Sequence, residues 1–144
     1  DSQLTFDIDL ARSQTNDNPV YYIQYAHARI CSVLRKLADE GVVRERNQVA
    51  GDLSLLNLDE EKELANQLAR YPELIRNAAT QREPHQLPQY LRELAGQLHT
   101  YYNAHKVLVE DPALRDARVT LYLAVRQVIE NGLGLLGISA PEEM

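Results

Sequence analysis

The sequence predicts an all-α protein, an antiparallel helical bundle of about five helices. Apolar residues recur every three or four positions through long parts of the chain, which is the spacing of one buried helix face. Proline, glycine and asparagine separate these parts at places that suit helix ends. Residues 18–144 contain no strand-rich segment, no hairpin signal and no internal repeat, so the predicted architecture is helices packed on helices.

Residues 1–17 are interpreted as a lead-in to the bundle. Their apolar residues alternate with polar ones, as in a short strand or an extended segment, at Leu4, Phe6, Ile8 and Leu10. Asp7 and Asp9 share a face of such a strand, but no acid–base partner or pocket accompanies them, so no catalytic role is assigned. Because the chain begins with Asp1 instead of methionine, we expect it to be part of a longer protein.

The first long helix is predicted from about Pro19 to Asp39. Pro19 suits the first helical turn, where its missing N–H has no partner to lose, and Asn18 can cap the helix. Gly41 is well placed to end it. The apolar face of this helix comprises Ile23, Ala26, Ile30, Val33, Leu34 and Leu37. Beside that face runs a stripe made of Tyr22, Tyr25, Arg29, Ser32 and Lys36.

Three members of this stripe, Tyr22, Tyr25 and Arg29, are candidates for contact with single-stranded nucleic acid. Aromatic rings stack on unpaired bases, and a planar guanidinium binds phosphate or stacks on a ring. The alternative is that tyrosines flanking an apolar face belong to the edge of the core and keep their hydroxyls in water. On spacing alone, this core interpretation is favoured.

The middle of the chain is predicted to hold a loop and two shorter helices. Residues 42–57 combine mixed charge with Gly51, which is typical of a loop with a short turn. A helix follows from Leu58 to about Arg70, with Asn57 as its cap and an acidic first turn. A further helix begins at Pro72 and continues to about Thr80.

Two long helices are predicted to complete the bundle. After the break at 83–85, one runs from Gln86 to about Glu110, and the pair Asp111-Pro112 ends it. The last runs from about Ala113 to Leu136. Its predicted buried positions are Leu114, Ala117, Leu121, Ala124, Val125, Val128 and Leu135.

Two patterns that suggest chemistry are set aside. Residues 132–137 match the dinucleotide pattern G-x-G-x-x-G, but that motif needs a strand before it and a helix after it. His27 and Cys31 are four apart and could share a metal or form a thiolate–imidazole pair, yet zinc needs three or four ligands. We predict that both pack inside the bundle, and that His99 and His105 have structural roles. No catalytic and no metal-binding residue is assigned.

The composition fits one domain with a sizeable core, since the chain has 144 residues and ordinary apolar content. No run of 18 apolar residues exists, so no membrane partner is expected. The single cysteine fits a reducing compartment, which indicates the cytoplasm. A net charge of −6 argues against an extended nucleic-acid footprint. Positive charge nevertheless gathers near the first helix, at Arg29, Arg35, Lys36, Arg44 and Arg46, and acidic residues lie elsewhere, at Asp59, Glu60, Glu61 and Glu63.

Residues 18–30, with the sequence NPVYYIQYAHARI, closely resemble the helix that opens the anticodon-binding domain of arginyl-tRNA synthetases. That domain is the all-helical type named after a DALR sequence signature. Residues 121–129 and 132–137 resemble the family's last helix, and Pro141-Glu142-Glu143-Met144 resembles its terminal tail. Tyr101-Tyr102-Asn103 is similar to an aromatic-Tyr-Asn step in the penultimate helix.

The resemblance implies that residues 18–144 bind the anticodon stem-loop of the tRNA for arginine, while 1–17 lead in from a missing catalytic domain of the same chain. The full-length family enzyme joins arginine to its tRNA with ATP and magnesium. Neither catalytic signature of its class, His-x-Gly-His or Lys-Met-Ser-Lys, occurs here, so this fragment should be inactive alone and hold no cofactor. We expect a cytoplasmic monomer. Every arginine codon has a middle G, so all cognate anticodons share a middle C.

By resemblance, Tyr22, Tyr25 and Arg29 would face the anticodon loop, with Tyr102 and Met144 nearby. Tyr102 also lies on the predicted apolar face, so a core role competes with tRNA contact. The sequence departs from the family in two places: Glu143 stands where an arginine is frequent, and His105-Lys106 stands where Cys-Arg is frequent. The alternative function is a helical protein–protein interaction module without a nucleic-acid partner, which the net acidic charge supports.

Overall fold

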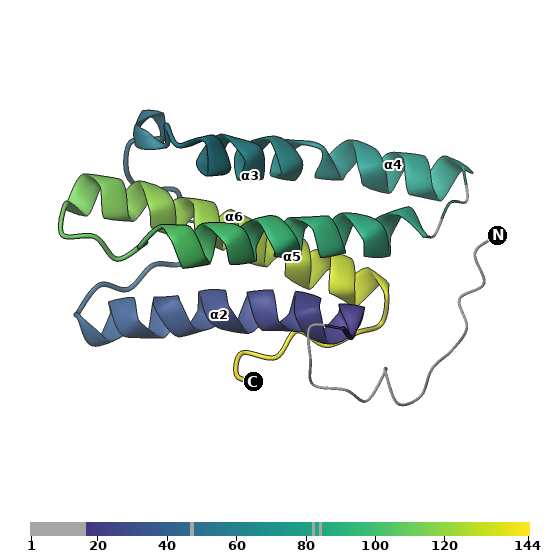
Figure 1. Ribbon diagram of the computed structural model, residues 1–144, viewed down its shortest axis with the longest axis horizontal. Helices are drawn as coiled ribbons and strands as arrows, with labels where there is room; N and C mark the ends of the chain where they lie inside the picture. Colours follow the sequence, from purple (N-terminus) through teal and green to yellow (C-terminus); the bar gives the residue numbers. More distant parts are fainter. Residues whose placement is uncertain (1–16, 47, 82, 84) are drawn as a thin grey trace.

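The computed structural model describes residues 17–46, 48–81, 83 and 85–144. Every regular element in these residues is helical, which confirms the predicted all-α class (Figure 1). The elements follow in the order α2 (Pro19–Asp39), the 3₁₀ turn η1 (Leu53–Leu55), α3 (Asp59–Ala69), α4 (Tyr71–Gln81), α5 (Gln86–Ala104) and α6 (Pro112–Leu135). The extended segment expected over residues 1–17 lies, except for residue 17, outside the described part of the chain.

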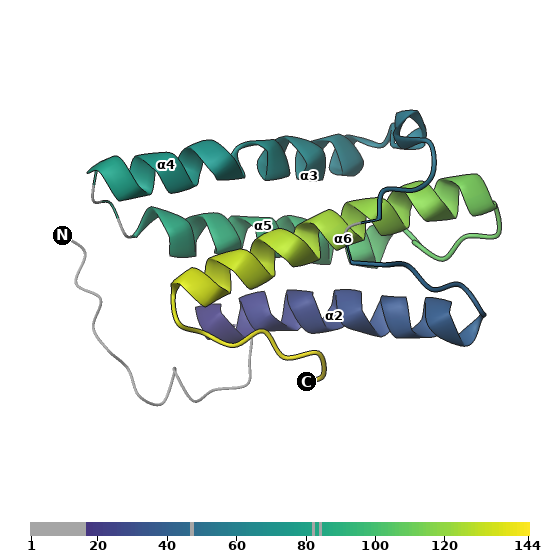
Figure 2. The ribbon, with the colours of Figure 1, turned by 180° about the vertical axis from the view of Figure 1, so that it is seen from behind.

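The helices form a bundle in which α5 and α6 are central. Helices α3 and α4 follow each other end to end along one side, and α2 covers the opposite side (Figures 1 and 2). α5 packs against α2, α3, α4 and α6, while α6 packs against α2, α3 and α5. The segment after α6 turns back across α2 (Figure 2). The first helix is therefore covered by α5 and α6 on one side and by the end of the chain on another.

The predicted ends of α2 are confirmed. The side chain of Asn18 accepts a hydrogen bond from the amide of Val20 at 3.0 Å, and Pro19 occupies the first turn. At the other end Gly41 has φ of 89°, a left-handed conformation that glycine adopts without strain. The amide of Val42 then bonds back to the carbonyl of Leu37 at 3.1 Å. Local capping chemistry therefore marks both ends of this helix.

The predicted ends of two other helices are wrong, one because of a contact with another helix and one because of a different local cap. α5 ends at Ala104 instead of Glu110, and the chain leaves it in an extended conformation at His105. Arg118 of α6 donates to the carbonyl of Lys106 at 2.7 Å, which satisfies a backbone group that a helix would have used. α3 is capped by Leu58 and not by Asn57; the Leu58 amide donates to the carboxylate of Glu61 at 3.1 Å.

The buried face of α6 also differs from the predicted one. Ala124 and Leu135 are exposed, the latter with 60% of its surface accessible. Tyr122, Ile129 and Leu133 are buried instead. Because neighbours contact α6 on several sides, its buried surface is wider than a single apolar stripe and is not centred where simple spacing puts it.

One acidic residue of α3 is part of the core. The side chain of Glu61 is fully buried and accepts hydrogen bonds from the Tyr101 hydroxyl at 2.6 Å and from Arg118 Nε at 2.8 Å. Burial, and the bond to Glu61, raise the pKa of Tyr101 far above its ordinary value. This Glu61–Tyr101–Arg118 network joins α3, α5 and α6. The sequence grouped Glu61 with Asp59, Glu60 and Glu63, but the structure places its side chain in the core.

Candidate nucleic-acid interface

The guanidinium of Arg29 lies between two tyrosine rings. It is 4.6 Å from the centroid of Tyr25, one turn earlier on α2, and 4.3 Å from the centroid of Tyr102 on α5. All three side chains are half-buried. Contacts of this kind attract a cation to the ring face and are worth about 0.5–1 kcal/mol at exposed sites. The structure thus brings three of the predicted site residues together.

His99 fixes the orientation of Arg29. Arg29 Nη1 donates to His99 Nδ1 at 2.9 Å, and His99 Nε2 donates to the Tyr22 carbonyl at 3.2 Å. Burial lowers the pKa of His99, and the neighbouring Arg29 charge lowers it further, so the ring is neutral at pH 7. A neutral ring with its proton on Nε2 satisfies both bonds. The structural role predicted for His99 is confirmed, but its link to Arg29 was not predictable from spacing.

Tyr22 has a different environment from the other predicted site residues. Its ring packs against His99, with the centroids 4.7 Å apart, and its hydroxyl lies 3.4 Å from where a Cβ on Gly96 would be. It therefore fits between α2 and α5 at the edge of the core. Tyr21, which the sequence analysis did not select, stacks on Tyr25 at 6.0 Å with the planes 17° apart, and so extends the aromatic surface along α2.

A surface hollow of about 410 Å³ joins four of the five predicted site residues. We call it the α2 hollow. It is lined by Tyr25, Ala28, Arg29, Ser32, Arg35, Tyr102, Glu143 and Met144. Tyr22 does not line it. Met144, from the end of the chain, is half exposed and closes one wall. The hollow therefore combines aromatic rings, two guanidinium groups and a methionine, contributed by α2, α5 and the residues after α6.

Three side chains of α2 hold the residues after α6, which we call the tail (residues 138–144). Gln24 Nε2 donates to the Ser139 carbonyl at 2.9 Å, and Arg35 Nη1 donates to the Glu142 carbonyl at 3.1 Å. Between them, His27 Nδ1 lies 2.9 Å from the Pro141 carbonyl. These contacts place Glu143 and Met144 beside the hollow.

His27 holds the tail as an imidazolium. Its Nε2 lies 2.7 Å from the Glu130 carboxylate while its Nδ1 faces the Pro141 carbonyl, so both ring nitrogens need a proton. Burial alone would lower the pKa of His27, but hydrogen bonds with Cys31, Glu130 and Pro141 outweigh it and raise the pKa to about 9. The predicted burial of His27 and Cys31 is confirmed. The contact of His27 with the tail was not predicted from the sequence.

The positive charge near the α2 hollow is smaller than the sequence indicated. Arg44 donates to the Asp116 carbonyl at 3.2 Å and to Thr120 Oγ1 at 2.6 Å, so it fastens the loop after α2 to α6. Arg46 pairs with Glu130. Arg29 and Arg35 remain on the wall of the hollow, and Lys36 follows on the same helix.

Neither a metal site nor a membrane-spanning helix is found among the described residues. Among them, no group of three or more histidine, cysteine, aspartate or glutamate side chains is arranged to bind a metal ion. None of the described helices has the length and apolar character needed to span a membrane.

Comparison with known proteins gives one consistent family. The sequence model of the DALR anticodon binding domain matches residues 23–144. Similar curated proteins are named arginine–tRNA ligase. One from Thioalkalivibrio sulfidiphilus is 60% identical over 144 residues, and one from Coxiella burnetii (strain CbuK_Q154) is 57% identical. Both matches cover all of this chain but only 25% and 24% of the relatives, so the chain spans about a quarter of their length.

Solved structures agree with the sequence comparison. The Thermus thermophilus arginyl-tRNA synthetase matches with a TM-score of 0.79 and 37% identity, over 96% of this chain and 23% of that one. A chain from Campylobacter jejuni matches with a TM-score of 0.80 and 31% identity, over 96% of this chain and 29% of that one.

Proposed function

The chain belongs to the DALR anticodon-binding domain family, and from this premise we propose that it binds the anticodon arm of the tRNA for arginine. Residues 18–144 would form the binding domain, with 1–17 leading in from the catalytic domain of a longer arginyl-tRNA synthetase. The observation that carries the proposal is the α2 hollow, where Tyr25, Arg29, Tyr102 and Met144 converge.

The middle cytosine of the anticodon is the base that best suits the α2 hollow. Unpaired cytosine presents O2 and N3 as acceptors and the N4 amino group as a donor. Arg29 uses Nη1 for His99, which leaves other N–H groups of its fork free to donate to acceptors of a base or to a phosphate. The carboxylate of Glu143, which also lines the hollow, is an acceptor suited to the N4 amino group. This assigns a use to the residue that departs from the family pattern.

The tyrosines supply stacking surface. Tyr25 and Tyr102 each already have one contact with the guanidinium of Arg29, so their orientation is fixed before RNA arrives. A base that stacks on such a ring gains about 1–3 kcal/mol, because every base has a face to offer. Met144 adds a polarisable apolar side chain to the lining of the hollow.

Catalysis would reside outside this chain. We assign arginine activation, with ATP and magnesium, to the catalytic domain of the longer cytoplasmic enzyme, and we expect that enzyme to be a monomer. The class signatures are absent from these 144 residues. The chain alone should therefore show no arginine-dependent exchange of ATP with pyrophosphate.

The test is titration of the 144-residue chain with an arginine anticodon stem-loop at several salt concentrations. Affinity should fall with rising salt and should fall further when the middle cytosine is replaced by another base. Equal affinity for the altered loop and for an unrelated hairpin would contradict the proposal. The net charge of −6 favours the second candidate, a protein–protein interaction module, and absence of any RNA binding would leave that function in its place.

A further inference from the structure

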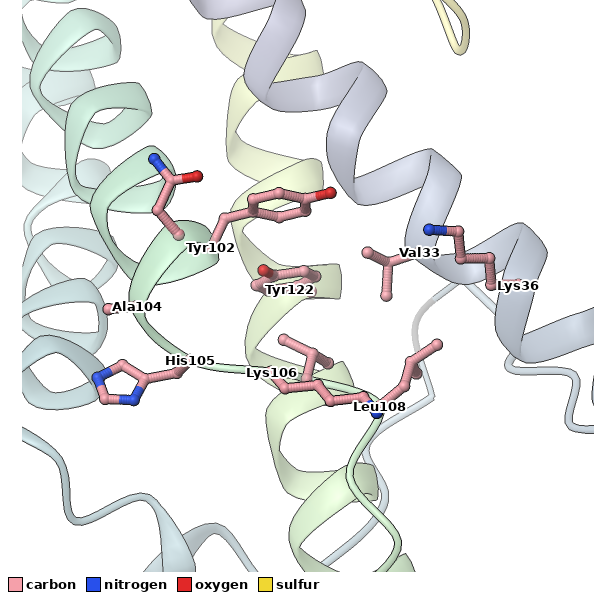
Figure 3. Close-up of a pocket in the computed structure, with 10 residues that line it drawn as sticks. Val33, Lys36, Tyr102, Ala104, His105, Lys106, Leu108 and Tyr122 are labelled. Carbon is pink, nitrogen blue, oxygen red and sulfur yellow. The ribbon is translucent and has the colours of Figure 1, made fainter.

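A second pocket lies on the other side of Tyr102, where α5 ends. It encloses about 380 Å³ between the end of α2, the residues that follow α5, and α6 (Figure 3). We call it the α5-end pocket. Its apolar side is formed by Val33, Val107, Leu108 and Tyr122, and its polar side by Lys36, Asn103, His105 and Lys106. Tyr102 lines both this pocket and the α2 hollow, so the two sites share a wall.

Tyr122 is the most buried of the residues that line the α5-end pocket. This residue is only 1% exposed, and its ring packs edge-on against Tyr101 at 6.0 Å. No hydrogen bond joins its hydroxyl to a residue that the structure describes, and Tyr122 lines the pocket, so a ligand there can reach it. Burial raises the pKa of Tyr122, so the hydroxyl is neutral and can either donate or accept. A ligand in the pocket would supply the missing partner.

The rim of the α5-end pocket is positively charged. Lys36 and Lys106 are both exposed, and neither ammonium group forms an ion pair with a described residue. His105, by contrast, is used by the fold, because its Nε2 lies 3.0 Å from the Glu60 carboxylate. A pocket with an aromatic and aliphatic floor, an unpaired hydroxyl and two free ammonium groups suits a planar group that carries a phosphate.

We propose that the α5-end pocket is a second nucleotide subsite, which takes the base that adjoins the nucleotide in the α2 hollow. The base would lie against Val33 and Tyr122 and bond to the Tyr122 hydroxyl, while Lys36 and Lys106 neutralise the flanking phosphate. The shared wall at Tyr102 would separate the two neighbouring bases. This inference rests on the proposed function, since it needs the RNA to occupy the α2 hollow first.

The decisive variant is Tyr122→Phe, because it removes one oxygen and keeps the ring. Affinity for the arginine anticodon stem-loop should fall about threefold to tenfold, the size of one net hydrogen bond. The unfolding midpoint should stay the same or rise, since the hydroxyl has no hydrogen-bond partner in the described part of the chain. A lower midpoint would mean that the hydroxyl serves the protein itself, and would overturn the inference.

The lysines test the phosphate contact. Lys36→Ala and Lys106→Ala should each reduce the salt dependence of binding by about 0.7 in the log–log slope, as expected for one single-strand phosphate contact. Lys62→Ala is the matched control, because Lys62 is exposed on α3 and lines neither site. An unchanged slope in both pocket variants, or an equal loss in the control, would count against the subsite.

An abasic scan of the loop identifies the occupant and separates the two proposals. Removing the base next to the middle cytosine should weaken wild-type binding by on the order of tenfold, and should cost clearly less in Tyr122→Phe. If Arg29→Ala weakens binding while the pocket variants bind like wild type, the subsite is wrong and the proposed function stands. If wild type does not bind the stem-loop at all, both proposals fail.

Discussion

Two arginines of this bundle each meet tyrosines, yet their surroundings are opposite. Arg118 lies inside the Glu61–Tyr101–Arg118 network, where a fully buried carboxylate and the Lys106 carbonyl take its donors. Arg29 lies between Tyr25 and Tyr102 and has a neutral histidine as its only hydrogen-bond partner among the described residues. The same residue types thus form a structural joint at Arg118, where the buried charges are paired. At Arg29 they form a site whose guanidinium keeps N–H donors for a ligand.

The difference shows what distinguishes a binding surface from a core of similar composition. In the core network each charge is matched, because an unmatched buried charge is very costly. At the α2 hollow the rings fix the guanidinium in place without neutralising it, since a cation–π contact leaves the N–H groups free. Order without charge compensation is the property that a site for an anionic ligand needs.

The largest effect on stability should follow from breaking the Glu61–Tyr101–Arg118 network. Glu61→Gln leaves Arg118 buried without a counter-charge, which should lower the free energy of unfolding by about 3–5 kcal/mol. Urea unfolding measures this. Glu63→Gln, an exposed neighbour on the same helix, is the control and should change little. A loss below about 1 kcal/mol would mean that the network is not the structural joint described here.

Removing the Arg29 side chain should weaken RNA binding strongly and change stability little. Arg29→Ala should weaken binding of the arginine anticodon stem-loop by about 1.5–3 kcal/mol, the worth of hydrogen bonds to a charged group. The free energy of unfolding should fall by no more than about 1 kcal/mol, because only ring contacts and one histidine bond are lost. Arg76→Ala on α4, on the opposite side of the bundle, is the control.

If Arg29→Ala destabilises the protein as much as Glu61→Gln does, Arg29 and Arg118 both serve the stability of the fold. Arg29 would then be a structural residue, and the site assignment would be wrong even though the family assignment holds.

Tyr25 and Tyr102 should differ from each other in a smaller way. Each change to alanine should cost about 1–3 kcal/mol of RNA binding if the ring stacks on a base. Tyr102→Ala should also reduce stability, because Tyr102 packs against the core, whereas Tyr25→Ala should not. Thermal unfolding and RNA titration of both variants separate these contributions. Equal losses of stability would argue that neither tyrosine is reserved for binding.

The smallest effect concerns pH. The folded-state pKa of His27 is about 9, above the unfolded value of about 6.5, so its contribution to stability is complete below pH 6.5. That contribution should disappear as pH rises from 6.5 through 9, when the imidazolium loses a proton. By linkage the whole pKa difference is worth about 3 kcal/mol, but the folded protein can release the tail instead, so the observed loss should be on the order of 1 kcal/mol.

His27→Gln is the variant that isolates this effect. Its stability should show a flatter dependence on pH between 6.5 and 9 than wild type, measured by urea unfolding in matched buffers. A wild-type curve that is already flat over this range would contradict the doubly protonated ring.

The helix ends show how far local sequence determines this fold. The predictions at Pro19 and Gly41 are confirmed because proline and glycine act through their own backbone. Pro112 was expected to end the preceding helix, and instead it starts α6. The end of α5 was not predicted correctly, since the buried contact of Arg118 with the Lys106 carbonyl decides it, twelve residues along the chain. The burial of Glu61 was missed for the same reason: its partners, Tyr101 and Arg118, lie far away in sequence.

The candidate site also contains residues that local sequence predicts and residues that it does not. Tyr25 and Arg29 were selected from the period of one helix, and that period is a local property. Tyr102 and Met144 came only from the family resemblance, because no spacing rule brings α5 and the tail to α2. Tyr22 shares the stripe but is taken by His99, a partner on α5 that the stripe does not reveal. The anticodon contacts of all five remain predictions.

The α2 hollow depends on the tail, which follows every helix of the bundle in the sequence. The fully buried core residues end at Leu133, and of the tail only Ile138 and Ala140 pack against them, whereas Glu143 and Met144 line the α2 hollow. A polypeptide cut short ahead of Pro141 would therefore keep its helices and lose both those lining residues and the anchor for His27. During synthesis the hollow is finished only after every helix that supports it. A damaged or incomplete chain would consequently persist as a folded protein with a defective binding surface, instead of being exposed by unfolding.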